Sequence, residues 1–109
     1  MAEVIKVLGQ LNPSAATLTA LYTVPAATTA VCSSLVVCNR SGVATAFRVS
    51  IAVAGAADDP IQYIHYDHAI GANATIPIVI GITLAATAVV RVYATLATLS
   101  FNLFGVEST

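Results

Sequence analysis

Charge is the scarcest property of this sequence. Of its 109 residues, four are basic and five are acidic, which leaves a net charge of −1 at neutral pH. Nucleic acids and anionic membrane surfaces are bound through clusters of Lys and Arg, and four scattered basic residues do not form such a cluster. We therefore expect neither nucleic acid nor a membrane surface among the partners of this protein.

The sequence also lacks the pattern of a membrane-spanning segment or a secretion signal. Two uncharged stretches, residues 7–39 and 69–90, are long enough to cross a bilayer, but Pro, Gly and Asn interrupt both of them. The first residues include Glu3 and show no long apolar run before a cleavage site. We expect no membrane helix and no secretory leader.

Large aromatic residues are few, although apolar residues are abundant. The chain has no Trp, one Met, four Tyr and three Phe, while hydrophobic residues as a class make up 58% of it. The core is therefore expected to consist of Val, Ile and Leu with a few aromatic anchors. Charged residues usually form about a quarter of a soluble protein, against 8% here. A surface so poor in charge indicates contact with other protein, so we expect an assembly subunit.

Cysteine is represented only by Cys32 and Cys38. Six residues apart in one regular strand, the two side chains would share a face and lie about 20 Å apart. A disulfide needs Cα atoms within about 7 Å of each other, so these two thiols are not expected to pair. Two interpretations stay open: the cysteines are small buried hydrophobic residues, or they form cross-links between subunits.

Motifs of enzymes are absent as well. The sequence has no Gly-x-Ser-x-Gly elbow around a nucleophile and no glycine pattern of the Walker or Rossmann type. The only adjacent carboxylates, Asp58 and Asp59, precede Pro60, which is typical of a solvated turn. We therefore expect a protein that is not an enzyme, with no catalytic residues, no cofactor and no metal.

The sequence does contain alternation with a period of two residues, broken by turns. In residues 44–54, the odd positions from Phe47 to Val53 are large and apolar, whereas the even positions carry Ala, Arg and Ser. In residues 32–38 both faces are apolar, which predicts a central strand. Further strands are expected at residues 4–11, 17–24, 61–70, 74–82, 88–95 and 99–104.

Eight short strands at this spacing predict an all-β protein, an antiparallel β-sandwich of the jelly-roll or immunoglobulin-like type. Residues 1–109 contain no linker and no internal repeat, so we expect a single domain. Residues 1–12 are set off from the rest by Asn12 and Pro13. They are expected to form a strand, or an N-terminal arm that pairs with a neighbouring subunit.

The densest polar cluster is YIHYDH at residues 63–68. A regular strand places Tyr63, His65 and Asp67 on one face and the alternate positions, including His68, on the other, unless a bulge intervenes. One interpretation is that these side chains pack across the sheet. The other is acid–base use or a metal site built on His-x-Asp, which would need a further ligand.

The arginines are the remaining charged residues of interest. Arg48 and Arg91 interrupt apolar strands, and Arg40 lies in a predicted turn. Either they occupy exposed positions, or they contact a carboxylate or main-chain carbonyl groups of an adjoining subunit. The candidate subunit contacts are Arg40, Arg48, Arg91, Tyr63, His65 and Asp67.

Six short motifs recur in the same order in one group of proteins that this chain resembles. The motifs are LYTVP (21–25), CNRS (38–41), FRV (47–49), ITL (82–84), VRVYA (90–94) and FNLFGVE (101–107). Over residues 11–107 the chain resembles the small virion structural proteins of tailed bacteriophages, which are often encoded among tail and fibre genes. The resemblance implies a non-enzymatic, multicopy virion component that is made in the host cytoplasm.

The function expected from these observations is structural. The protein would self-associate, as a trimer or other ring, at the tail, baseplate or fibres of a virion, with itself and other virion proteins as partners. A capsid decoration or cement protein that bridges capsomers is the alternative within this class. A carbohydrate- or ligand-binding β module that uses Tyr63, His65, Tyr66 and Asp67 is the alternative from another class.

Overall fold

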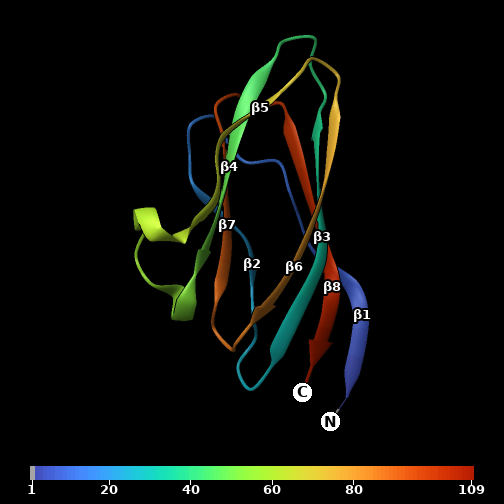
Figure 1. Ribbon diagram of the computed structural model, residues 1–109, viewed down its shortest axis with the longest axis vertical. Helices are drawn as coiled ribbons and strands as arrows, with labels where there is room; N and C mark the ends of the chain where they lie inside the picture. The colour runs from blue at the N-terminus through green and yellow to red at the C-terminus, as the bar shows by residue number, and fades with distance from the viewer. Residues whose placement is uncertain (1) are drawn as a thin grey trace.

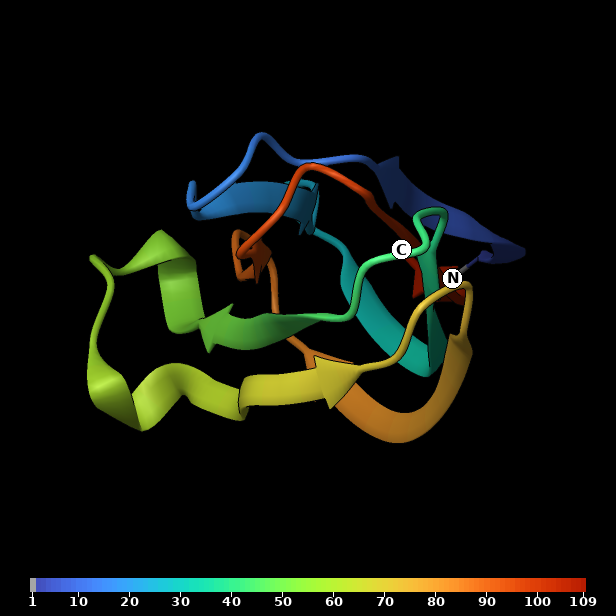
Figure 2. The same cartoon turned by 90° about the horizontal axis from the view of Figure 1, so that it is seen from above.

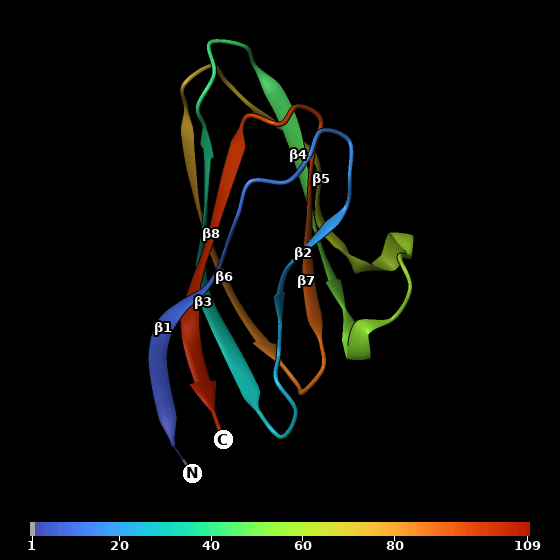
Figure 3. The same cartoon turned by 180° about the vertical axis from the view of Figure 1, so that it is seen from behind.

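The computed structural model describes residues 2–109 and shows two four-stranded antiparallel sheets packed face to face (Figures 1 and 3). Sheet A contains, in spatial order, β1 (Glu3–Leu11), β8 (Leu99–Ser108), β3 (Thr29–Asn39) and β6 (Thr75–Leu84). Sheet B contains β2 (Thr19–Thr23), β7 (Val89–Ala94), β4 (Thr45–Ala52) and β5 (Tyr63–Ile70). The predicted all-β sandwich of about eight strands is confirmed.

The strand order is that of a jelly roll. The pairs β1–β8, β2–β7, β3–β6 and β4–β5 are those of one long hairpin whose two arms run from the chain ends to a central turn. Pairing of β3 with β8 and of β4 with β7 rolls this hairpin into two sheets. A double-sheet, eight-stranded architecture of this kind is a jelly roll rather than an immunoglobulin-like sandwich.

The core lies between the two sheets and is made mainly of Val and Leu side chains. Phe47 of β4 and Phe101 of β8 are fully buried, and their ring centroids lie 6.0 Å apart in an edge-to-face arrangement. This geometry is favourable for aromatic pairs and joins the two sheets toward the end that carries the β3–β4 loop. The expected core of aliphatic residues with few aromatic anchors is therefore present.

A β-bulge in β3 changes where the cysteines point. The pairing of β3 with both β6 and β8 shifts register between Cys32 and Ser34. Cys32 is consequently fully buried in the core, whereas Cys38 is half-buried on the outer side of sheet A. The prediction that both thiols share a face is wrong, because it assumed a regular strand. The predictions that β3 is central and that the two thiols do not pair are confirmed.

β4 is shorter than the predicted strand. It ends at Ala52, and Val53, expected to point into the core, begins the 3₁₀ helix η1 (Val53–Gly55) and is exposed. The segment from η1 through η2 (Pro60–Gln62) projects beside β4 and β5, where it is coloured green to yellow-green in Figure 2. The guanidinium of Arg91 donates to main-chain carbonyl oxygens of this segment, which fixes it to sheet B.

β1 is an edge strand of sheet A and pairs with β8 of the same chain, from Glu3 opposite Ser108 to Leu11 opposite Phe101. The first and last described residues are joined by two main-chain hydrogen bonds between Ala2 and Thr109, of 2.9 and 3.2 Å. Both termini therefore lie at the same end of the sandwich (Figure 1). Exchange of β1 with a neighbouring subunit stays a prediction, and Met1 lies outside the described residues.

One polar contact bridges the two sheets at this end. The Tyr22 hydroxyl of β2 donates to Glu107 Oε2 of β8 at 2.5 Å, and Lys6 Nζ of β1 lies 3.1 Å from Glu107 Oε1. Tyr22 is buried and only 13% of the Glu107 side chain is exposed. Within residues 2–109, no helix has the length and apolar character needed to cross a membrane.

Candidate functional site

The outer face of sheet B carries a cluster of aromatic and charged side chains centred on Arg48. The Arg48 guanidinium carbon lies 4.2 Å from the ring centroid of Tyr66 and 4.4 Å from that of Tyr93. Its Nε donates to Asp67 Oδ1 at 2.7 Å. Arg48 and Tyr93 are direct cross-strand partners of β4 and β7, so the sheet itself positions this stack.

β-bulges in β5 bring Tyr66 and Asp67 to the same cluster. The pairing of β5 with β4 shifts register twice, on either side of Val49, and Asp67 has a left-handed backbone with a φ of 50°. Short polar residues tolerate this conformation better than most others do. The predicted grouping of Tyr63, His65 and Asp67 on one face is therefore wrong, because a regular strand was assumed.

The bulges place both histidines against the core instead. The rings of His65 and His68 pack on Phe47, with centroid distances of 6.1 and 4.9 Å, and their Nδ1 atoms lie 3.2 Å apart. Burial lowers the pKa of His65, and the neighbouring His68 lowers it further. Within residues 2–109, no group of three His, Cys, Asp or Glu residues is placed to hold a metal ion. The further ligand that the metal hypothesis required is thus not found there.

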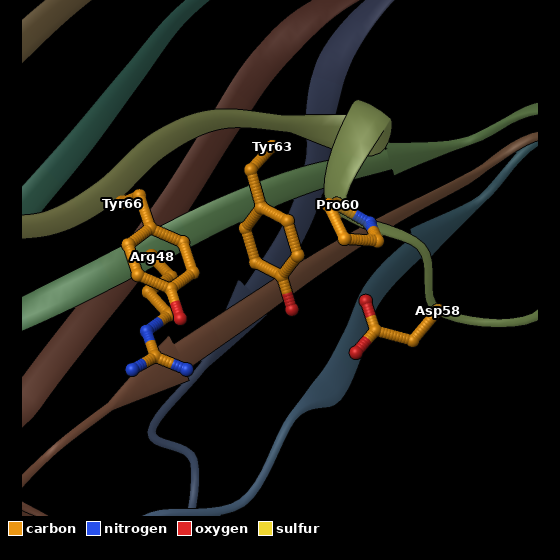
Figure 4. A pocket seen from close by; sticks show the side chains of 5 residues that line it. All are labelled: Arg48, Asp58, Pro60, Tyr63 and Tyr66. Carbon is orange, nitrogen blue, oxygen red and sulfur yellow. The ribbon is translucent and has the colours of Figure 1, made fainter.

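A pocket of about 450 Å³ opens beside the Arg48 cluster (Figure 4). It is lined by Arg48, Asp58, Pro60, Tyr63 and Tyr66. The Tyr63 and Tyr66 rings meet edge to face with centroids 5.1 Å apart, and the Tyr63 hydroxyl points toward the Asp58 carboxylate. Burial and this carboxylate raise the pKa of Tyr63. The pocket can therefore offer aromatic edges together with hydrogen-bond donors and acceptors.

The structure brings together only some of the residues singled out from the sequence. Arg48, Tyr63, Tyr66 and Asp67 meet in one cluster, whereas His65 lies on the opposite face of β5. Sequence reasoning missed Asp58, which it assigned to a solvated turn, and Tyr93. The signal for Tyr93 was its position two residues after Arg91 in an alternating strand, which predicts a shared face.

Arg40 and Arg91 bind carbonyl acceptors of their own chain rather than the side chains of this cluster. Arg40 Nη2 lies 3.4 Å from the Ala97 carbonyl oxygen, and Arg91 Nη1 and Nη2 lie 2.9 and 3.4 Å from those of Ala56 and Gly55. Both guanidinium groups thus bind carbonyl groups of their own chain, whereas the interpretation of the sequence placed such carbonyl groups on an adjoining subunit. Contacts of these residues with a neighbouring subunit stay predictions.

The outer face of sheet A differs from sheet B in having almost no charge. Strand register and alternating burial place its side chains in rows across the four strands. The rows are Ile5–Val106–Val31–Thr83, Val7–Phe104–Ser34–Val79, Gln10–Asn102–Val36–Pro77 and Ser100–Cys38–Thr75. We call this surface the neutral face. None of the residues in these rows is charged; Glu3 lies at one end beside Ser108 and Thr29, and Arg40 follows β3 at the other end.

The scan of protein-family models found no match for this chain, and the search of curated proteins found none either. The candidate functional surfaces are the neutral face and the tyrosine-lined pocket.

Proposed function

We propose that this protein is a self-associating structural subunit of a bacteriophage virion. One observation carries the self-association: large apolar side chains are exposed on a molecule that has almost no charge to keep it dispersed. Ile5 and Val79, on the outer face of sheet A, are 87% and 89% exposed. The register places Val106, Val31 and Phe104 between these two positions, and an extended apolar surface of this kind usually marks a contact with another protein.

Two further observations support a place in a virion. The order of six motifs over residues 11–107 resembles small virion proteins of tailed phages. The jelly roll is an architecture used by viral capsid proteins, although lectins and cupins share it, so the fold is compatible with the proposal without deciding it. The tail, baseplate or fibres are our first choice of location, and capsid decoration is the alternative.

Self-association is tested by light scattering of the purified chain during size-exclusion chromatography. We expect an oligomer at micromolar concentration. A dispersed monomer at millimolar concentration would contradict the proposal. The location is tested by copy number in purified particles, where small multiples of three or six indicate the tail and hundreds of copies indicate capsid decoration.

The pocket beside Arg48 favours a second candidate function, binding of a carbohydrate. Sugars are held by aromatic rings next to planar polar groups, and Tyr63, Tyr66, Asp58 and Arg48 provide both. Glycan-array binding that is lost in Tyr66→Ala would support it. Tyr93→Ala is the matched control, because it also removes one ring from Arg48 but does not line the pocket. Absence of binding by the wild-type chain would rule this candidate out.

A further inference from the structure

We propose that the neutral face is the surface through which two copies of this chain pair, with the same face used on both copies. This inference rests on the proposed self-association and adds the surface and the symmetry to it. The occupant of the neutral face is thus a second copy of the chain, sheet A against sheet A.

Charge favours this face over the other one. A two-fold pair places each patch opposite its own copy, so any charge on the patch meets a like charge or must lose water to be buried. Between its end rows the neutral face has no charged side chain to repel or desolvate. The outer face of sheet B would bury the Arg48–Asp67 pair, in which Asp67 is half exposed, together with Arg91.

The edges of the sandwich are poorly suited to pairing between copies, which leaves a face as the contact. The free edge of β6 contains Pro77 and a Gly81 with φ of 44°, and the edge of β5 is interrupted by bulges. β2 has only five residues, and β1 has a bulge and carries Glu3 and Lys6. Prolines, bulges, short strands and charges are the devices that prevent edge-to-edge association.

The neutral face is also large enough for a stable pair. Four strands at about 4.8 Å spacing give a width of about 19 Å, and residues rise about 3.3 Å each along a strand. The 11 residues of β3 therefore span about 36 Å, which gives a face of about 700 Å² in projection. Stable protein pairs of standard size bury about 600–1,000 Å² on each partner, a range that includes this face. Two such sheets would stack about 10 Å apart, as sheets do within a sandwich.

The test introduces one lysine at a time at three positions of nearly equal exposure. Val79→Lys in β6 and Ile5→Lys in β1 lie on the neutral face, and Ile61→Lys in η2 is the matched control beside sheet B. All three side chains already face water, so folding should be retained, which thermal melting checks. Sedimentation velocity over a concentration series then gives the dissociation constant of each variant.

We expect the wild type and Ile61→Lys to form even-numbered oligomers with equal affinity. Val79→Lys and Ile5→Lys should each weaken association at least tenfold, because each places two buried lysines in one symmetric interface. If Ile5→Lys lost association and Val79→Lys did not, the result would indicate exchange of β1 between copies and overturn the contact through two neutral faces. Equal affinity in all variants, or a trimeric wild type, would overturn it while leaving self-association intact. A monomeric wild type would overturn both proposals.

Discussion

Tyr22 of sheet B is joined to sheet A through a charged partner, Glu107 of β8. Its hydroxyl donates to Glu107 at 2.5 Å from a buried position. Tyr22→Phe removes this bond and should lower the free energy of unfolding by about 1.5–3 kcal/mol, the usual range for a hydrogen bond to a charged group. Denaturant unfolding measures the change. Tyr93→Phe is the control, and an equal loss there would contradict the assignment.

The Tyr22–Glu107 hydrogen bond also makes the stability of the fold depend on pH. Donation from Tyr22, and secondly from Lys6, lowers the pKa of Glu107 in the folded chain. A carboxylate whose pKa is lower in the folded state than in the unfolded state stabilises the fold fully at a pH above the unfolded-state pKa. This contribution is lost as the pH falls through the folded-state pKa. Wild-type stability should therefore decrease below about pH 5, and Tyr22→Phe should decrease less steeply. A steeper decrease in stability for the variant than for the wild type would contradict a lowered pKa of Glu107 in the folded chain.

Some residues have roles that no sequence pattern displays. Gly105 lies within β8, where alternation alone treats it as a weak strand position. In the structure an added Cβ would overlap the carbonyl oxygen of Val31 and press on Leu8 and Cys32. Such close approaches depend on which strand lies alongside, and that information is spread over the whole chain.

At the scale of the element, the bulge of β3 sets the reactivity of the two thiols. Burial raises the pKa of Cys32 to about 11, whereas Cys38 reaches the surface of the neutral face. A disulfide reagent at pH 8 should therefore label one thiol per folded chain and two per unfolded chain, measured under dilute, monomeric conditions. Cys38→Ser should abolish the fast labelling. Rapid labelling of both thiols in the folded wild type would contradict the burial of Cys32 that the bulge of β3 produces.

The strands themselves could be predicted, and their irregularities could not. Period-two alternation located all eight strands to within a few residues, because each has one face in the core. The bulges of β3 and β5 were not predicted from the sequence, because a bulge is defined by the pairing with the partner strand rather than by its own residues. The composition of the pocket was missed for this reason: the bulge in β5 redistributes Tyr66, Asp67 and the histidines.

At the scale of the whole molecule, association through an uncharged face should respond little to salt. Screening weakens contacts between exposed charges, and the neutral face contributes almost none. The dissociation constant of the oligomer should therefore stay constant or decrease as NaCl is raised from about 50 to about 500 mM. Over this range the Debye screening length falls from about 14 to about 4 Å. Sedimentation velocity at several salt concentrations measures it. Marked dissociation at high salt would indicate contacts through Arg48, Asp67 or the other charged residues.

The shortage of charge was visible in the composition, but the distribution of that charge was not. Five of the nine charged residues, which include Arg48, Arg91 and Asp67, gather on or beside sheet B because the jelly-roll order brings β4, β5 and β7 together. Strand order depends on contacts between distant segments, which local alternation does not specify. The sequence therefore suggested that the surface would be covered by protein without indicating which side.

The two ends of the chain, joined by main-chain hydrogen bonds between Ala2 and Thr109, have a consequence for engineering. A linker of a few Gly and Ser residues would connect them without disturbing β1 or β8. New termini opened in the loop between β3 and β4, at the opposite pole of the sandwich, would then give a circular permutant (Figure 1). In the native order, any cargo fused to either end would emerge from one pole of the molecule.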